Sequence, residues 1–255
     1  MLPERVIRTF VCFMGAGAVV AGQAFGGMIL TTRNTDEATG KKHSRRTFVL
    51  GAMIRTEEPG KASILRPDLG RLWEIPSDGS TCLLYTAADL ARMQQTASES
   101  VDAPAPVPGT RSSAAAPPPV SEAPKATYRK LASSESVGKW RTDRFAREID
   151  GVKTAEVWVV PLSALKVRRS ELAALEKAEA TFGAAPSVWD QEILSLLKDA
   201  QMIGYEAFPV KIAEMDGSGK ARTVSELSRV DREKIPYRNF QPPSDCTKAA
   251  QVPGR

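Results

Sequence analysis

The sequence predicts an α+β protein in which an antiparallel sheet packs against a helical hairpin. Three observations support this fold class. Short apolar and β-branched runs alternate with turn residues along residues 27–85, as in consecutive β-hairpins. Apolar residues then recur at helical spacing in two successive segments between residues 168 and 202. Between these regions lies a stretch rich in proline, alanine and serine.

The N-terminal half of the sheet is expected over residues 25–95. Turn residues such as Gly40 and the PGK run at 59–61 separate its strands. The candidate strands are residues 27–34, 44–50, 52–57, 62–66, 71–75 and 81–85. A short helix is expected at residues 87–95, because Leu90 and Met93 lie three positions apart on one helical face.

Residues 96–126 are expected to form a disordered Pro/Ala/Ser-rich insertion. They hold seven of the chain's 18 prolines and lack aromatic residues, so they cannot bury enough surface to offset the entropy of ordering. The chain is also proline-rich near its end, from residue 236 onward. We therefore expect a disordered tail at residues 244–255.

The C-terminal half of the sheet is expected over residues 127–243, together with the helices. Asp150-Gly151 is a strong hairpin signal, and Ser187 followed by Asp190 resembles a capping box at the start of a helix. The candidate strands are residues 127–132, 138–148 and 153–160, and then the runs FPVKIAEMD and ARTVSELSRVD. The two helices are expected at residues 168–182 and 188–202, forming a hairpin.

The N-terminus has the features of a signal peptide at residues 1–24. Arg5 and Arg8 precede the apolar run VCFMGAGAVVAG, and Gly22-Gln23-Ala24 supplies a small-x-small cleavage site. The chain is therefore expected to be periplasmic or secreted. The alternative is an uncleaved helix that anchors the protein, since about 20 uncharged residues can span a bilayer.

Two cysteines, Cys82 and Cys246, remain after removal of the signal peptide. An even pair in an oxidising compartment makes a disulfide between them a candidate. The alternative is that Cys82, which lies in the apolar run TCLLYT, is a buried free thiol. The sequence leaves both interpretations open, because it does not show the distance between the two Cα atoms.

The residue types argue against most catalytic and cofactor chemistry. His43 is the one histidine and has basic neighbours, which disfavour the protonated form that a catalytic histidine must adopt. The Cys and His residues show no zinc spacing, and no phosphate-binding loop opens a helix. We expect no cofactor, no metal and no enzyme activity. A net charge of +5 without strong clustering of basic residues argues against a nucleic-acid partner.

Five arginines lie on neighbouring predicted strands, so some are expected to share one face of the sheet. They are Arg45, Arg46, Arg55, Arg66 and Arg71. Charges on the wet face of a half-buried sheet are the ordinary expectation, and a patch that binds anionic lipids or envelope polymers is the alternative.

Several runs together resemble a family of secreted bacterial proteins classed as a domain of unknown function. They are VLGAMIRTEE, SILRPDLGRLWEI, KTAEVWVV, FPVKIAEMD and KIPYRNFQPP. That family is similar in layout to periplasmic lipoprotein carriers and outer-membrane lipoprotein receptors. The resemblance implies an incomplete antiparallel β-barrel that wraps helices and encloses an apolar cavity. In contrast to the family's usual pattern, the run KWRTDRFAREI carries no cysteine.

The resulting hypothesis is a non-catalytic cell-envelope protein that binds an apolar ligand, such as a lipid or acyl chain, or docks an envelope partner. The residues expected to line the cavity are Trp73, Leu84, Trp140, Trp158 and Val160. Two alternatives stay open: a purely structural or interaction module, and a hydrolase of envelope substrates that uses carboxylates.

Overall fold

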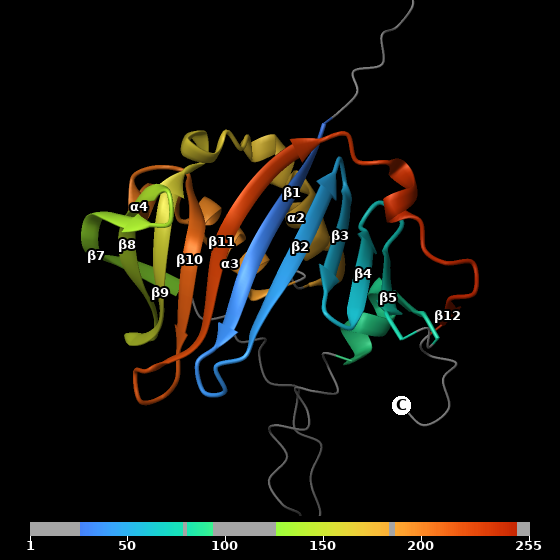
Figure 1. The fold of residues 1–255 in the computed structure, drawn as a ribbon, viewed down its shortest axis with the longest axis horizontal. Coiled ribbons are helices and arrows are strands. Elements are labelled where there is room, and N and C mark those ends of the chain that lie inside the picture. The colour runs from blue at the N-terminus through green and yellow to red at the C-terminus, as the bar shows by residue number, and fades with distance from the viewer. Residues whose placement is uncertain (1–25, 79–80, 94–125, 184–186, 249–255) are drawn as a thin grey trace, which may run out of the picture.

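The computed structural model describes residues 26–78, 81–93, 126–183 and 187–248 (Figure 1). The predicted signal peptide at residues 1–24 lies outside these ranges. So do all residues of the predicted insertion except Ala126, and the tail from residue 249 onward.

The described strands form a single sheet. In chain order they are β1 (Gly27–Asp36), β2 (Lys42–Leu50), β3 (Met53–Glu58), β4 (Lys61–Arg66), β5 (Arg71–Pro76), β6 (Leu83–Thr86), β7 (Ala126–Val137), β8 (Trp140–Ile149), β9 (Val152–Pro161), β10 (Ala207–Met215), β11 (Ala221–Glu233) and β12 (Thr247–Lys248). Each strand of the N-terminal half overlaps its predicted range, because the turn residues between the strands mark their ends.

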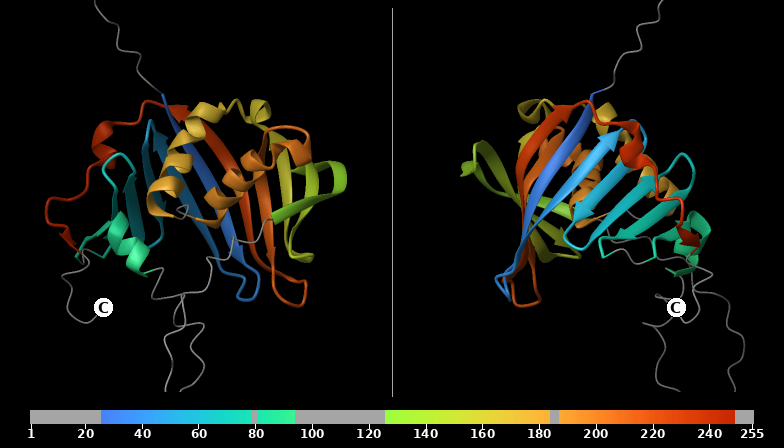
Figure 2. Two further views of the ribbon diagram at one scale, coloured as in Figure 1. Left: turned by 180° about the vertical axis from the view of Figure 1, so that it is seen from behind. Right: turned by 45° about the vertical axis from the view of Figure 1, so that its right-hand side comes forward.

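The sheet order shows how the two halves join. It runs β12-β6-β5-β4-β3-β2-β1-β11-β10-β9-β8-β7, so each half is a meander and the halves meet where β1 pairs with β11. Every pairing is antiparallel except the short parallel contact between β12 and β6. The sheet curls without closing and has edges at β7 and β12 (Figure 2). This is the predicted α+β fold with an incomplete barrel.

Helices lie within the curve of the sheet. A 3-10 turn, η1 (Leu162–Leu165), leads into α2 (Arg169–Phe182), which is followed by α3 (Val188–Lys198) and α4 (Ala200–Ile203). Figure 2 shows α2 and α3 crossing the concave side of the sheet. The sequence predicted a helical hairpin in this position. The predicted helix at 188–202 is interrupted at Asp199, which ends α3 and begins α4.

The main core forms between these helices and the sheet. Leu172, Leu175 and Ala178 on α2 are fully buried, and their spacing of three residues places them on one helical face. Ile193, Leu196 and Leu197 on α3 are buried in the same cluster, with strand residues such as Val157 and Ile212. The inside of the incomplete barrel is therefore largely filled by the protein's own side chains.

A second, smaller core lies on the opposite face of β1–β6. Strand alternation separates the two: Leu65 belongs to the main core, whereas its neighbour Ile64 belongs to the smaller one. The buried members of the smaller core are Ile29, Phe48, Ile64, Trp73, Cys82, Ile235 and Phe240. Two of these, Ile235 and Phe240, come from the chain that follows β11.

Residues 234–248, here called the C-terminal strap, cover this smaller core. The strap includes the 3-10 turn η2 (Tyr237–Phe240), which contacts β3 and β4. Ile235 packs against Gly27 so closely that a Cβ on that glycine would lie 2.3 Å from Ile235 Cδ1. Cys246 then forms a disulfide with Cys82, with their Cα atoms 4.5 Å apart. Sequence alone left this pairing open against a free thiol.

The strap corrects the predicted start of the disordered tail. Residues 244–248 were assigned to that tail from composition, but they carry the disulfide and strand β12. Composition failed here because a covalent link and pairing with β6 replace the burial that this polar segment lacks.

Strand β7 is also longer than predicted. It was expected at residues 127–132 but continues to Val137, with register shifts relative to β8 and a positive φ of 60° at Ser134. As an edge strand, β7 tolerates both the bulges and the polar side chains.

Candidate functional site

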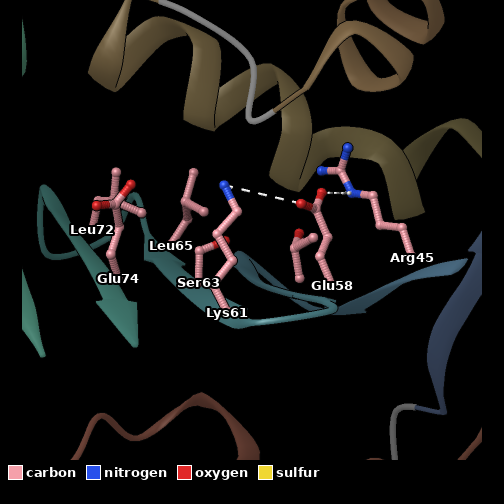
Figure 3. A pocket seen from close by; sticks show the side chains of 8 residues that line it. Arg45, Glu58, Lys61, Ser63, Leu65, Leu72 and Glu74 are labelled. Atoms are coloured by element: carbon pink, nitrogen blue, oxygen red, sulfur yellow. Dashed lines mark ion pairs between the residues drawn. The ribbon is translucent and has the colours of Figure 1, made fainter. Parts of the chain in front are cut away.

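A hollow of about 130 Å³ lies on the concave side of β2–β5, beside α2. Figure 3 shows its side chains in a row across the strands, from Leu72 and Glu74 on β5 to Arg45 on β2. The lining residues are Arg45, Thr56, Glu58, Lys61, Ser63, Leu65, Leu72 and Glu74. The row thus combines leucine side chains with charges of both signs.

Arg45 is held at the β2 end of the hollow by a buried ion pair with α3. Its Nη2 lies 3.4 Å from Oδ2 of Asp190, and the exposed fraction of Asp190 is only 1%. Ser187, the N-cap of α3, accepts a hydrogen bond from the Asp190 backbone N–H and donates its hydroxyl to Oδ2. Burial raises the pKa of Asp190 above its ordinary value, while Arg45 and Ser187 act in the opposite direction.

Two polar atoms at this end of the hollow have no hydrogen-bond partner. They are Nε of Arg45 and Oγ1 of Thr56, both shielded from solvent by the surrounding protein. Glu58 Oε1 lies 3.4 Å from Arg45 Nε but forms no hydrogen bond with it. A buried polar group without a hydrogen-bond partner costs about 1–3 kcal/mol, so the Thr56 hydroxyl is destabilising, whereas the nearby Glu58 charge offsets part of the cost at Arg45 Nε.

The remaining charges lie along the rim and already have partners. The carboxylate of Glu58 lies between Arg45 and Lys61, whose Nζ is 3.9 Å from Glu58 Oε2. At the other end, Tyr85 donates a hydrogen bond of 3.2 Å to Glu74. The side chain of Lys61 is 63% exposed and can swing away from the hollow.

A second buried carboxylate fixes α3 to the far half of the sheet. Glu192 is fully buried; it accepts a hydrogen bond of 2.6 Å from the Tyr128 hydroxyl on β7 and pairs with Arg147 on β8. Burial raises the pKa of Glu192, and burial together with the Glu192 charge raises the pKa of Tyr128. Because Asp190 and Glu192 bind opposite halves of the sheet, α3 holds the concave surface in one shape.

The predicted cavity residues do not come together in the structure. Trp73 and Leu84 are direct cross-strand partners on β5 and β6, and both belong to the smaller core beneath the strap. They therefore face away from the hollow. The alternation of side chains along the strands correctly predicts that Trp73 and Leu84 share one face of the sheet. That face is covered by residues 234–248, which lie far from both residues in the sequence.

The other three predicted residues pack in or against the main core. Trp158 and Val160 on β9 are buried, and Trp140 is partly buried against the same cluster. The Trp158 ring lies between Lys211 Nζ, 4.7 Å from its centroid, and Arg144, and its indole N–H donates to Glu135. None of the five predicted residues lines the concave hollow or the two hollows beside the strap.

Four of the five arginines share the convex face, as strand register requires, and Arg45 lies on the other side. Two of the four hold the strap: Arg55 donates to the carbonyl of Asn239 and Arg66 to the hydroxyl of Tyr237. Two further hollows lie beside the strap on this face. Arg55 and Arg66 therefore have a structural role.

Within the described ranges, no three His, Cys, Asp or Glu side chains gather as a metal site would require. The helices in those same ranges are all too short or too polar to cross a bilayer.

The fold is an open antiparallel sheet that wraps helices, and a hollow lined by polar and apolar side chains lies on its concave side. A protein-family model described as a domain of unknown function (DUF4412) matches residues 179–246. These residues extend from α2 to the disulfide cysteine Cys246. The sequence resemblance to a domain of unknown function is confirmed over this part of the chain. No curated protein matches the chain.

Several solved structures are similar at low sequence identity. An uncharacterized conserved protein from Thermus thermophilus is 8% identical with a TM-score of 0.47, and the match covers 88% of this chain and 90% of that one. A chain of the MucA/MucB complex of Pseudomonas aeruginosa is 7% identical with a TM-score of 0.40, and the match covers 87% of this chain and 57% of that one. A putative outer membrane lipoprotein-sorting protein domain from Vibrio parahaemolyticus is 9% identical with a TM-score of 0.29, and the match covers 86% of this chain and 90% of that one.

Proposed function

We propose that this protein is a non-catalytic binding protein of the cell envelope, and that its concave hollow receives one group of a ligand or partner. The observation that carries the proposal is the hollow itself, in which Leu65 and Leu72 lie beside charged side chains and the Thr56 hydroxyl makes no hydrogen bond. A mixed polar and apolar lining of this kind suits a group that has both polar and apolar parts. The leader-like N-terminal sequence supports export.

The size of the hollow supports capture of part of a ligand. Pockets that enclose a whole drug-sized molecule measure about 300–1,000 Å³, whereas this hollow measures about 130 Å³. A complete lipid chain does not fit inside it. The ligand is therefore amphiphilic: its polar group enters the hollow, and its apolar part lies along Leu65 and Leu72.

The carboxylates support binding over hydrolysis. Asp190 and Glu192, the carboxyl groups whose pKa values burial raises, are 1% and 0% exposed, so no substrate reaches them. In the hollow itself, Glu58 is held by two cations and Glu74 by Tyr85. A hydrolase that works through carboxylates needs a convergent pair of accessible carboxyl groups, which the hollow and the two buried carboxylates do not supply.

Native mass spectrometry of protein purified from the envelope of the exporting cell tests the proposal. We expect a co-purifying molecule on the wild-type protein. It should be lost from Leu72→Trp, because the indole fills the hollow. Val152→Trp is the matched control, since Val152 is 65% exposed and does not line the hollow. A wild-type protein without any bound molecule, or one retained equally by both variants, would contradict the proposal.

A further inference from the structure

We propose that the larger of the two hollows beside the strap binds a single-chain anionic amphiphile, an unbranched alkyl chain that ends in a carboxylate. This hollow, here called the strap hollow, measures about 480 Å³. Pockets that hold small ligands measure about 300–1,000 Å³, so the strap hollow is large enough for a ligand chain. It is separate from the concave hollow, so the inference goes beyond the proposed function.

Two segments far apart in sequence form the walls of the strap hollow. One wall is the start of the strap, and the other is the turn between β2 and β3 with the first residue of β3. The disulfide and the hydrogen bond from Arg55 to the Asn239 carbonyl hold the strap in place, so its wall is fixed before a ligand arrives. The apolar side chains of the two walls belong to Leu50, Ala52, Met53, Ile235 and Tyr237.

The apolar lining continues out to the solvent. Tyr237 is 52% exposed, and its ring lies beneath the Arg66 guanidinium, 5.7 Å from the ring centroid. Arg66 also donates a hydrogen bond of 3.2 Å to the Tyr237 hydroxyl. Because these two contacts orient the ring, an alkyl chain in the hollow can leave along its exposed face.

The charges that line the strap hollow favour an anion. The carboxylate of Asp68 is bound at both oxygens by Arg66, with distances of 2.9 Å from Nε and 2.7 Å from Nη2. That carboxylate is therefore already neutralised. Lys234 also lines the hollow, is exposed, and has no ion pair among the residues that the structure describes. An incoming carboxylate would pair with Lys234, whereas an ammonium would meet an uncompensated like charge.

Three probes separate the contribution of the chain from that of the charge. They are decanoate, decylamine and butyrate, each titrated below its micelle concentration into the full chain. NMR shifts of the backbone amides of Ala52, Met53 and Ile235 report binding at the strap hollow. We expect decanoate to bind at least about tenfold more tightly than butyrate, because its longer chain buries more apolar surface. It should also bind at least about fivefold more tightly than decylamine.

Variants at the rim and in the wall provide matched comparisons. Lys234→Gln should weaken binding of decanoate about threefold, as loss of one exposed ion pair predicts, without weakening binding of decylamine. Lys220→Gln is its control, because Lys220 is exposed and does not line the hollow. Ala52→Trp should abolish binding of decanoate, since the indole fills the hollow. Its control is Val152→Trp, at an exposed position outside the hollow.

The outcomes distinguish this inference from the proposed function. The inference is supported if decanoate shifts the strap hollow and both variants weaken binding relative to their controls. It is overturned if decylamine binds as tightly as decanoate, or if Lys234→Gln binds decanoate like wild type. It is also overturned if decanoate shifts only Thr56, Ser63 and Leu65, because the chain then occupies the concave hollow and the proposed function stands. Absence of any shift at the strap hollow overturns this inference alone.

Discussion

Arg45 on β2 and Asp190 on α3 form a buried ion pair across 145 residues of sequence, with Nη2 and Oδ2 3.4 Å apart. The pair does two things at once. It fixes the first turn of α3 against the N-terminal half of the sheet, and it holds the Arg45 guanidinium at the end of the concave hollow, where Nε faces Glu58 Oε1 at 3.4 Å.

Removing one partner of this pair should be costly. Asp190→Asn leaves a buried guanidinium without its main counter-charge, so we expect the free energy of unfolding to fall by about 3 kcal/mol. Glu58→Gln removes the other neighbour of Arg45, whose side chain is 25% exposed, and should cost less than about 1 kcal/mol. Urea denaturation measures both. Equal losses for the two variants would show that Asp190 does not anchor α3 in this way.

The disulfide should be a large contributor to the stability of the strap. Replacing Cys82 and Cys246 together by serine releases a link between residues 164 apart in sequence, and we expect a loss of about 3 kcal/mol. Denaturant unfolding of the oxidised wild type and the double variant measures the difference. A loss below about 1 kcal/mol would mean that Phe240 and the arginine contacts hold the strap without the disulfide.

Asp68 should make strap anchoring depend on pH. Hydrogen bonding from Arg66 holds the pKa of Asp68 below its usual range. A carboxyl group with a lowered folded pKa stabilises the protein above its unfolded pKa, and that stabilisation is lost as pH falls through the folded pKa. We expect Asp68→Asn to cost about 0.5 kcal/mol near neutral pH, and the difference to vanish in strong acid. A difference that is constant with pH would contradict this assignment.

The unpartnered hydroxyl of Thr56 should contribute nothing to stability. Thr56→Val replaces it with a methyl group of similar shape, so the free energy of unfolding should stay unchanged or rise by about 1 kcal/mol. The buried Thr142 is the matched contrast, because its hydroxyl donates a 3.0 Å hydrogen bond to the Glu135 carbonyl. Thr142→Val should lose about 1 kcal/mol. Urea melts that give the same loss for both variants would show that Thr56 is satisfied in solution.

Sequence patterns predicted the fold well where local signals decide it. Glycine, proline and aspartate mark the ends of β1–β6, and apolar spacing marks α2. The break at Asp199 was missed because apolar spacing continues across it into α4. The ordered strap residues were missed because long-range contacts to β6 hold them in place.

The candidate site was less predictable than the fold. Alternation puts Trp73 and Leu84 on one face and Arg45 on the other, but it does not say which face the helices cover and which the strap covers. Arg45 and Arg46 are adjacent and look alike in sequence. Only the position of Asp190, far along the chain, makes Arg45 the buried one.

The central claim, that the concave hollow holds a ligand or partner, is tested most directly by photo-crosslinking in the exporting cell. A benzophenone amino acid at Lys61, on the rim of the hollow, should form an adduct with the occupant. The same group at the exposed Val152 should form none. Absence of an adduct at position 61, or equal adducts at both positions, would contradict the account.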